Sequence, residues 1–324
     1  MSPRSPGRVK EMHAVQLTQK YALATAQCTE RDNALGIILQ QWKSQGYASH
    51  VEAGYRLLDV LYEGLQRHYP IDFLRRWELL KFVQTQSPQS LPSKLSIDGV
   101  GVGSSMALAA CRRFVDRVDT SAESGFHLTF VECDADRERP LALQLWTATH
   151  GALQRLGADG VLILSVQELY QTNTQLLLWV LFQSFATVHI VQPAACSLTS
   201  NDKYVVAIGY RPEVYRTQFE KDVSLPLGDP MEMMELCPVS WIAYILNLQT
   251  QFTHFKETMQ RQVEAVTRLL IRSYPRWTYA QSREFTRRCL ADPNAKLYCQ
   301  RYLETLQLSS NCNASEVSST HCAL

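Results

Sequence analysis

The chain has 324 residues, 46% of them hydrophobic and 19% charged, which is the balance of a globular protein and excludes a mostly disordered chain. The formal net charge of +1 gives no overall field that would favour nucleic acid or a membrane. No uncharged apolar run reaches the roughly 18 residues of a transmembrane helix, so we expect no membrane partner.

The nine cysteines are scattered along the chain, and no two of them have the spacing of a C-x-x-C pair. A disulfide framework or a zinc site is therefore not expected. The eight histidines share no metal-ligand spacing either, and we predict no metal. Reduced cysteines favour a protein of the nucleus and/or cytoplasm.

The two ends of the chain, residues 1–10 and 309–324, are rich in Ser, Pro and Asn, and we predict disordered tails there. Residues 11–92 form a predicted helical lead-in and linker. Apolar residues recur in it at three- and four-residue spacing, as at Leu35, Leu39 and Trp42, before the polar, Pro-rich stretch 84–93.

Between residues 93 and 212 short apolar strands alternate with helices. Strands are predicted at 94–98, 126–131, 160–166, 188–191 and 203–209, and helices at 105–118, 141–156 and 176–185. This alternation predicts an α/β fold with a mainly parallel sheet covered on both faces. Residues 213–308 form a predicted helical extension, in which one long helix begins near Trp241 and continues to about Ile271.

A run of glycines joins the first predicted strand to the helix after it. Asp98, Gly99, Gly101 and Gly103 lie where a cofactor loop would, because glycines allow a tight turn and the helix N-terminus offers free N–H donors. A tight turn without a ligand explains them equally well. The acid that should bind the ribose is misplaced, since Asp134 comes about 30 residues later and Asp119 falls on or just after the predicted helix.

Several segments resemble the FtsJ-like (RrmJ-like) ribose 2′-O-methyltransferase family. They are Ala53-Gly-Tyr-Arg-Leu-Leu58, Phe130-Val-Glu-Cys-Asp134, Asp159-Gly-Val-Leu-Ile-Leu-Ser165, Val188-His-Ile-Val-Gln-Pro193 and Cys196-Ser-Leu-Thr-Ser-Asn-Asp-Lys-Tyr204. The resemblance implies a Rossmann-like methyltransferase sheet, with S-adenosylmethionine as the family's cofactor and no metal. It is remote in residue identity, covers about residues 30–270, and is carried by the order of the motifs.

The same resemblance implies a degenerate catalytic site. The Lys-Asp-Lys-Glu tetrad of the family corresponds here to Arg56, Asp134, Ser165 and Asp202. In the family the central lysine orients the ribose hydroxyl and helps it to lose its proton. A serine at 165 carries no charge, and an arginine at 56 stays protonated. Each of the four residues also has an ordinary structural explanation, as a packing, capping, buried-strand or turn residue.

The closest resemblance is to the degenerate second domain of the two-domain mRNA cap methyltransferases that modify the second transcribed nucleotide. It implies a non-catalytic domain that helps a catalytic methyltransferase domain, in cis or in trans, to bind capped mRNA or other RNA or to stay folded. Two alternatives remain open. One is an active RNA 2′-O-methyltransferase, dependent on S-adenosylmethionine, with a rearranged site; the other is a protein-interaction scaffold.

A basic segment supports the RNA hypothesis. Residues 261–301 hold nine Lys or Arg against three acids, with Tyr274, Trp277, Tyr279 and Phe285 between them. Arginines beside aromatic rings suit the phosphates and bases of RNA. An ordinary solvated helix face is the alternative. The candidate RNA-binding residues are Arg272, Arg276, Arg283, Arg287 and Arg288.

Overall fold

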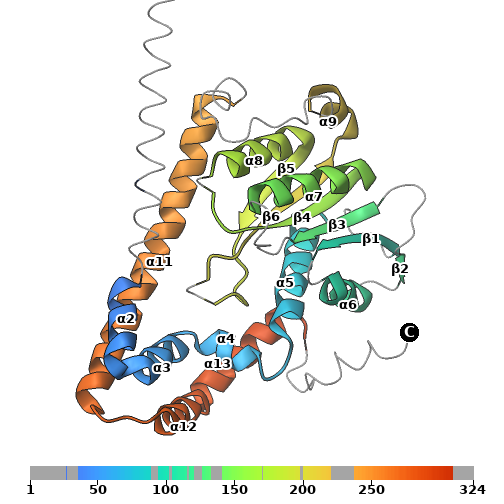
Figure 1. The fold of residues 1–324 in the computed structure, drawn as a ribbon. Coiled ribbons are helices and arrows are strands. Elements are labelled where there is room, and N and C mark those ends of the chain that lie inside the picture. The colour runs from blue at the N-terminus through green and yellow to red at the C-terminus, as the bar shows by residue number, and fades with distance from the viewer. Residues whose placement is uncertain are drawn as a thin grey trace, which may run out of the picture.

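The structure is a computed structural model that describes residues 27, 36–88, 94–101, 104–114, 117–119, 126–132, 141–169, 171–197, 200–219 and 237–308 (Figure 1). It is a mixed α/β fold, as expected, in which helices surround one mostly parallel sheet. The predicted tails at 1–10 and 309–324 lie outside the described residues, and so do Gly103 and Asp134.

Within the described residues the sheet has six strands in the order β2-β1-β3-β4-β6-β5. Their bounds are β1 Lys94–Gly101, β2 Arg117–Asp119, β3 Phe126–Glu132, β4 Leu156–Val166, β5 Phe185–Val191 and β6 Lys203–Tyr210. The pairs among β2, β1, β3 and β4 are parallel, whereas β6 is antiparallel to both β4 and β5. The last strand in the chain is therefore inserted between the two strands that precede it.

Two details of the prediction around the first strand are wrong. The predicted helix 105–118 is shorter, because α6 (Ser104–Phe114) ends early and β2 follows it. Three residues are too few to show a hydrophobic period, and it is pairing with β1 that makes them a strand. Gly99 and Gly101 belong to β1 and not to a loop, since they pair with Phe130 and Glu132 of β3.

Helices cover both faces of the sheet (Figure 1). The alternation along β4 shows this directly. On one face, Leu162 and Leu164 are buried against α7 (Leu141–Arg155) and α8 (Thr172–Ser184). On the other face, Ile163 is buried against α5 (Ile71–Gln86) and α6. Successive side chains of a strand point to opposite faces, so a strand that is apolar throughout needs a cover on each.

The rest of the structure is helical. The lead-in contains α2 (Ile37–Trp42), a π-helical turn (Lys43–Tyr47), α3 (Ala48–Leu58), α4 (Val60–Leu65) and α5; the extension contains α9 (Pro212–Gln218), α11 (Val239–Ser273), α12 (Tyr279–Leu290) and α13 (Pro293–Thr305). The long predicted helix is α11. Its N-terminal part packs on α8 through Trp241 and Ile245, and its C-terminal part packs on α3.

The lead-in and the extension pack against each other, although they lie at opposite ends of the chain (Figure 1). Gly54 of α3 lies so close to α11 that a Cβ atom there would come within 2.4 Å of Thr267 Oγ1. The indole of Trp77 on α5 donates to the carbonyl of Leu306, just after α13, at 2.8 Å. These contacts place α12 beside α3 and α4.

In the described part of the chain, no helix combines the length and the apolar character that a membrane span requires. Among the same residues, no three His, Cys, Asp or Glu side chains gather as metal ligands would.

Candidate functional site

The three tetrad positions that the structure describes do not form one cluster. Ser165 is half-buried near the end of β4, where it pairs with Tyr204 of β6, and Asp202 lies just before β6. Arg56 lies elsewhere, on α3, where it pairs with Glu52 at 3.1 Å and with Glu63 at 3.6 Å. Asp134 lies outside the described residues. The structure therefore places Arg56 with Glu52 and Glu63, and not with Ser165 or Asp202.

Two other arginines lie at the carboxyl edge of the sheet, where α/β proteins bind their ligands. Arg76 of α5 forms an ion pair with Glu132, the last residue of β3. Arg75 forms an ion pair with Asp202 at 3.2 Å. Sequence reasoning missed both arginines. The one available signal was a pair of adjacent arginines inside a helix that is otherwise largely apolar.

These ion pairs occupy part of the carboxyl edge of the sheet. Arg76 is 2% exposed, and its Nη1 also donates to the carbonyl of Asp72 at 2.6 Å. Burial raises the pKa of Glu132, and the charge of Arg76 opposes that rise. The Nε atom of Arg76 and the Oε1 atom of Glu132 are buried without a hydrogen-bond partner among the described residues. The pair thus fills space at the edge at an electrostatic cost.

Two carboxylates of the described edge, Glu132 and Asp202, are each held in an ion pair with an arginine of α5. An arginine does not lose its proton in a protein. Ser165 has no hydrogen bond to a carboxylate or an imidazole of the described residues that would activate it. The ammonium of Lys203 is buried and donates to the carbonyls of Gln167 at 2.7 Å and Asn201 at 3.1 Å. Its hydrogen bonds hold the loops beside β4 and β6 together.

The residues predicted to bind S-adenosylmethionine do not fit that role where the structure describes them. Asp98, Gly99 and Gly101 are tied into β1 by pairing with β3. Asp119 ends β2, the strand next to β1, and it follows Gly101 by 18 residues, the spacing expected of a ribose-binding acid. In the pairing of β1 with β2, however, Asp119 lies opposite Ser96. Ser96 is about 16 Å from Gly101 at the end of β1, at roughly 3.3 Å per residue.

A pocket of about 440 Å³ lies between the lead-in and the extension, and we call it the arginine pocket. It is lined by residues of α3, α4, α12 and the turn after α4: Arg56, Glu63, Arg67, Ala280, Arg283, Glu284, Thr286, Arg287 and Leu290. Four arginines face two glutamates, so the pocket is cationic. Residues about 230 positions apart in the chain meet in it.

The ion pairs within the arginine pocket leave part of its charge unneutralised. Glu284 accepts from Arg287 at 2.8 and 2.9 Å and from Arg288 at 2.9 Å, and these hydrogen bonds lower its pKa to about 2. Arg67 and Arg283 have no ion pair among the described residues. The guanidinium of Arg283 lies 5.8 Å from the centre of the Tyr279 ring. The charge of Arg67 acts on Glu63, where it opposes the rise in pKa that burial causes.

An aromatic cluster fixes the position of α12. The ring of His50 on α3 contacts Trp277 at 5.4 Å, and its Nε2 atom bonds to the carbonyl of Tyr274 at 2.8 Å. Tyr274 and Trp277 stack at 4.9 Å. A capping box between Thr278 and Gln281 then starts α12. The turn between α11 and α12 is thereby held on α3, which brings the arginines of α12 opposite Arg56.

The candidate RNA-binding residues divide into two groups. All five are exposed, but only Arg283 and Arg287 line the arginine pocket. Arg288 is paired with Glu284, Arg272 lies in the last turn of α11, and Arg276 lies in the turn after it. The aromatic residues predicted among them largely pack on one another, although Tyr279 remains 53% exposed. Arg67 was missed, because no sequence pattern connects it with α12.

A scan of the chain against protein-family models found no match, and a search of the curated proteins found none either.

Proposed function

We propose that this chain is a non-catalytic, methyltransferase-like domain that binds RNA through the arginine pocket. On this proposal it serves a cap 2′-O-methyltransferase whose catalytic domain lies in cis or in trans, in the nucleus and/or cytoplasm. The observation that carries the proposal is the pocket itself, in which Arg67 and Arg283 have no ion pair among the described residues.

The strand order supports the methyltransferase part of the proposal. A parallel sheet whose last strand is inserted, antiparallel, beside the edge strand is the arrangement of Rossmann-like methyltransferases, and β6 occupies that place between β4 and β5. The carboxyl edge supports the non-catalytic part. Arg76 and Glu132 occupy part of it as an ion pair, and the resemblance aligns Ser165 with the central lysine of the family.

The chemistry of the arginine pocket supports RNA as the ligand. A guanidinium donates two parallel hydrogen bonds to a phosphate and keeps its charge at any physiological pH. The pocket is larger than one phosphate requires, and exposed arginines continue from it along α12 and the end of α11. A chain of phosphates can therefore follow this surface, whereas a single small anion would use only part of it.

The test is RNA binding by the full chain, measured by fluorescence anisotropy with a labelled 20-nucleotide single-stranded RNA at several salt concentrations. The double variant Arg283→Glu/Arg287→Glu should bind at least about tenfold more weakly at low salt. The matched control is Arg112→Glu/Arg216→Glu. It makes the same change in charge at two exposed arginines of α6 and α9 that lie outside the pocket and outside the basic segment 261–301.

Equal loss of binding in both double variants would show that RNA responds only to overall charge, and the proposed site would be wrong. Absence of RNA binding by the unmodified chain at low salt would remove the function itself. Melting curves of all the variants establish that each one is folded.

A further inference from the structure

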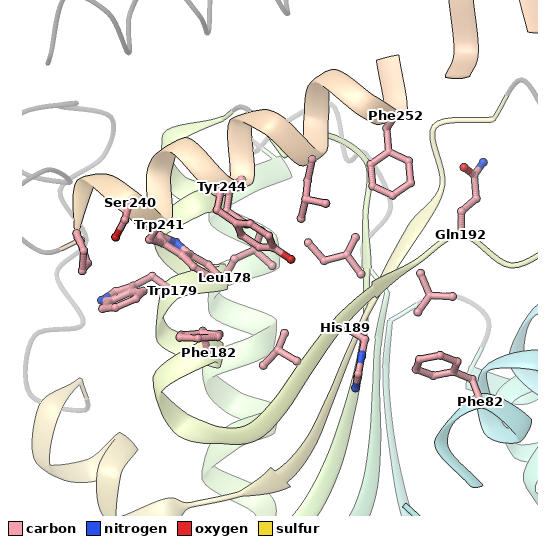
Figure 2. Close-up of a pocket in the computed structure, with 16 residues that line it drawn as sticks. Phe82, Leu178, Trp179, Phe182, His189, Gln192, Ser240, Trp241, Tyr244 and Phe252 are labelled. Atoms are coloured by element: carbon pink, nitrogen blue, oxygen red, sulfur yellow. The ribbon is translucent and has the colours of Figure 1, made fainter. Parts of the chain in front are cut away.

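A second, larger pocket lies at the β5 edge of the sheet, which is the edge opposite β2. Its lining is mainly apolar and aromatic, whereas the lining of the arginine pocket is mainly charged. It has a volume of about 1040 Å³ and lies between β5, α8 and α11 (Figure 2). We call it the β5 groove. Figure 2 shows Tyr244 and Trp241 of α11 above it, Trp179 and Phe182 of α8 at one end, and His189 of β5 below.

The β5 groove includes the free edge of the sheet. In the described structure β5 is the outermost strand and pairs only with β6, so alternate N–H and C=O groups along its outer side have no partner strand. Val188 and Ile190 pack toward α8 and α11, and Val191 packs toward the core of α5. His189 contacts Phe82 of α5 at 5.2 Å. Because residues from both faces of β5 line it, the groove straddles this edge.

Nothing in the sequence of β5 protects that edge. Natural edge strands commonly carry a lysine, a proline or a bulge that discourages pairing with another chain. The strand Phe185-Ala-Thr-Val-His-Ile-Val191 has no lysine or proline, and its pairing with β6 continues without a break from Thr187 to Val191. An unprotected edge beside a concave surface is a ready template for one more strand.

The side walls of the β5 groove define what such a strand must carry. None of its sixteen lining residues is Asp, Glu, Lys or Arg. Phe182 is 48% exposed and Tyr244 53% exposed, which is unusual for such large rings on one concave surface. A charged segment would lose its hydration here without finding a counter-charge, and an uncharged apolar segment would not.

We propose that the β5 groove binds an extended, uncharged, apolar peptide segment of a partner protein, which adds to β5 as a further strand. Alternate side chains of the peptide contact the aromatic wall of α8 and α11 on one side and Phe82 and His189 on the other. Backbone hydrogen bonds to β5 give affinity, and the two walls select the side chains.

The test uses a display library of random nine-residue peptides selected on the immobilised full chain. Enriched peptides are synthesised, and their binding is measured by fluorescence anisotropy. We expect peptides with apolar residues at alternate positions. Their affinity should fall about tenfold or more with Tyr244→Glu or Phe182→Glu. The control is Leu269→Glu, at a residue of α11 that is 61% exposed and lies outside the groove, and it should have no effect.

A second measurement tests the added strand itself. N-methylation of alternate residues removes the peptide's donors on one edge and keeps its side chains, so methylation of the pairing edge should weaken binding about tenfold and methylation of the other edge should not. Three results would overturn the proposal. They are no enrichment of any peptide, equal binding by the Tyr244→Glu variant, and a chain that dimerises through this groove, which sedimentation would reveal as a dimer lost in the same variant.

Discussion

Arg76 on α5 and Glu132 at the end of β3 form an ion pair across the carboxyl edge of the sheet, and Arg76 is 2% exposed. This contact lies where an α/β sheet normally receives its ligand. It also joins the helical lead-in to the middle of the sheet. The pair therefore contributes to the packing of this protein, and the anion site that we propose is the arginine pocket.

Removal of one partner of this pair should be costly. The Arg76→Met variant leaves the Glu132 carboxylate buried without its counter-charge, and we expect the free energy of unfolding to fall by about 3 kcal/mol or more. The double variant Arg76→Met/Glu132→Leu should recover most of that loss, since no charge is then left unpaired. Urea denaturation of the unmodified chain, the two single variants Arg76→Met and Glu132→Leu, and the double variant measures the coupling. If the losses in free energy of unfolding of the two single variants simply add in the double variant, Arg76 and Glu132 are not coupled.

The same pair predicts a dependence on pH. Burial raises the pKa of Glu132 in the folded protein, so the folded state binds this proton more readily than the unfolded state does. The stability that this difference contributes is fully present below the unfolded pKa and is lost as pH rises through the folded pKa. Loss of Arg76 removes the charge that opposes the rise, so the pKa of Glu132 should rise further in Arg76→Met.

The stability of Arg76→Met should therefore decline more steeply than that of the unmodified chain between about pH 5 and pH 8. Replacement of the titrating carboxyl in Arg76→Met/Glu132→Gln should remove the additional slope. Urea midpoints at several pH values give the comparison. Parallel pH profiles for the unmodified chain and Arg76→Met would show that Glu132 is not the titrating group.

S-adenosylmethionine should not bind the full chain at millimolar concentration. The glycines of β1 are held in the sheet, and Asp119 is level with Ser96 and not with Gly101. Isothermal titration calorimetry and thermal melts check this. A ligand present at 100 times its dissociation constant would stabilise the fold by about 2.7 kcal/mol, and a rise in melting temperature of that size would restore the enzyme hypothesis.

Glu284 should limit RNA binding, because it neutralises Arg287 and Arg288. The variant Glu284→Gln leaves both guanidinium groups available to phosphates, and we expect it to bind RNA about three- to tenfold more tightly at low salt. The anisotropy assay measures this gain. Its control is Glu304→Gln, which removes the same single negative charge on α13, outside the pocket. Weaker binding by Glu284→Gln would mean that Glu284 holds the arginines in their binding geometry.

Two glycines in helices should respond oppositely to the same substitution. Gly54→Ala should destabilise the fold, since its new Cβ atom would clash with Thr267 and separate α3 from α11. Gly151→Ala on α7 meets nothing within 4 Å and should stabilise the fold by about 0.5–1 kcal/mol, because alanine loses less backbone entropy. Thermal and urea unfolding check both. Equal effects would show that α3 and α11 do not depend on this close approach.

Much of the secondary structure could be predicted from local pattern. The apolar runs of β4 and β6, the helix that became α11, and the cover on both faces of the sheet all follow from hydrophobic period, since burial imposes that period on each element separately. The three residues of β2 could not be predicted, because a strand of that length has no period and exists only through its pairing with β1.

The candidate sites were harder to predict, because each depends on residues far apart in the chain. Arg56 was matched with the first lysine of the tetrad, yet it lies in the arginine pocket, and Arg76 lies at the carboxyl edge. The sequence by itself determined most of the order of strands and helices and the basic character of α12, since both are properties of short segments. Only the tertiary structure decided which of the described arginines form an ion pair and which do not, because packing of α3, α5 and α12 sets those distances.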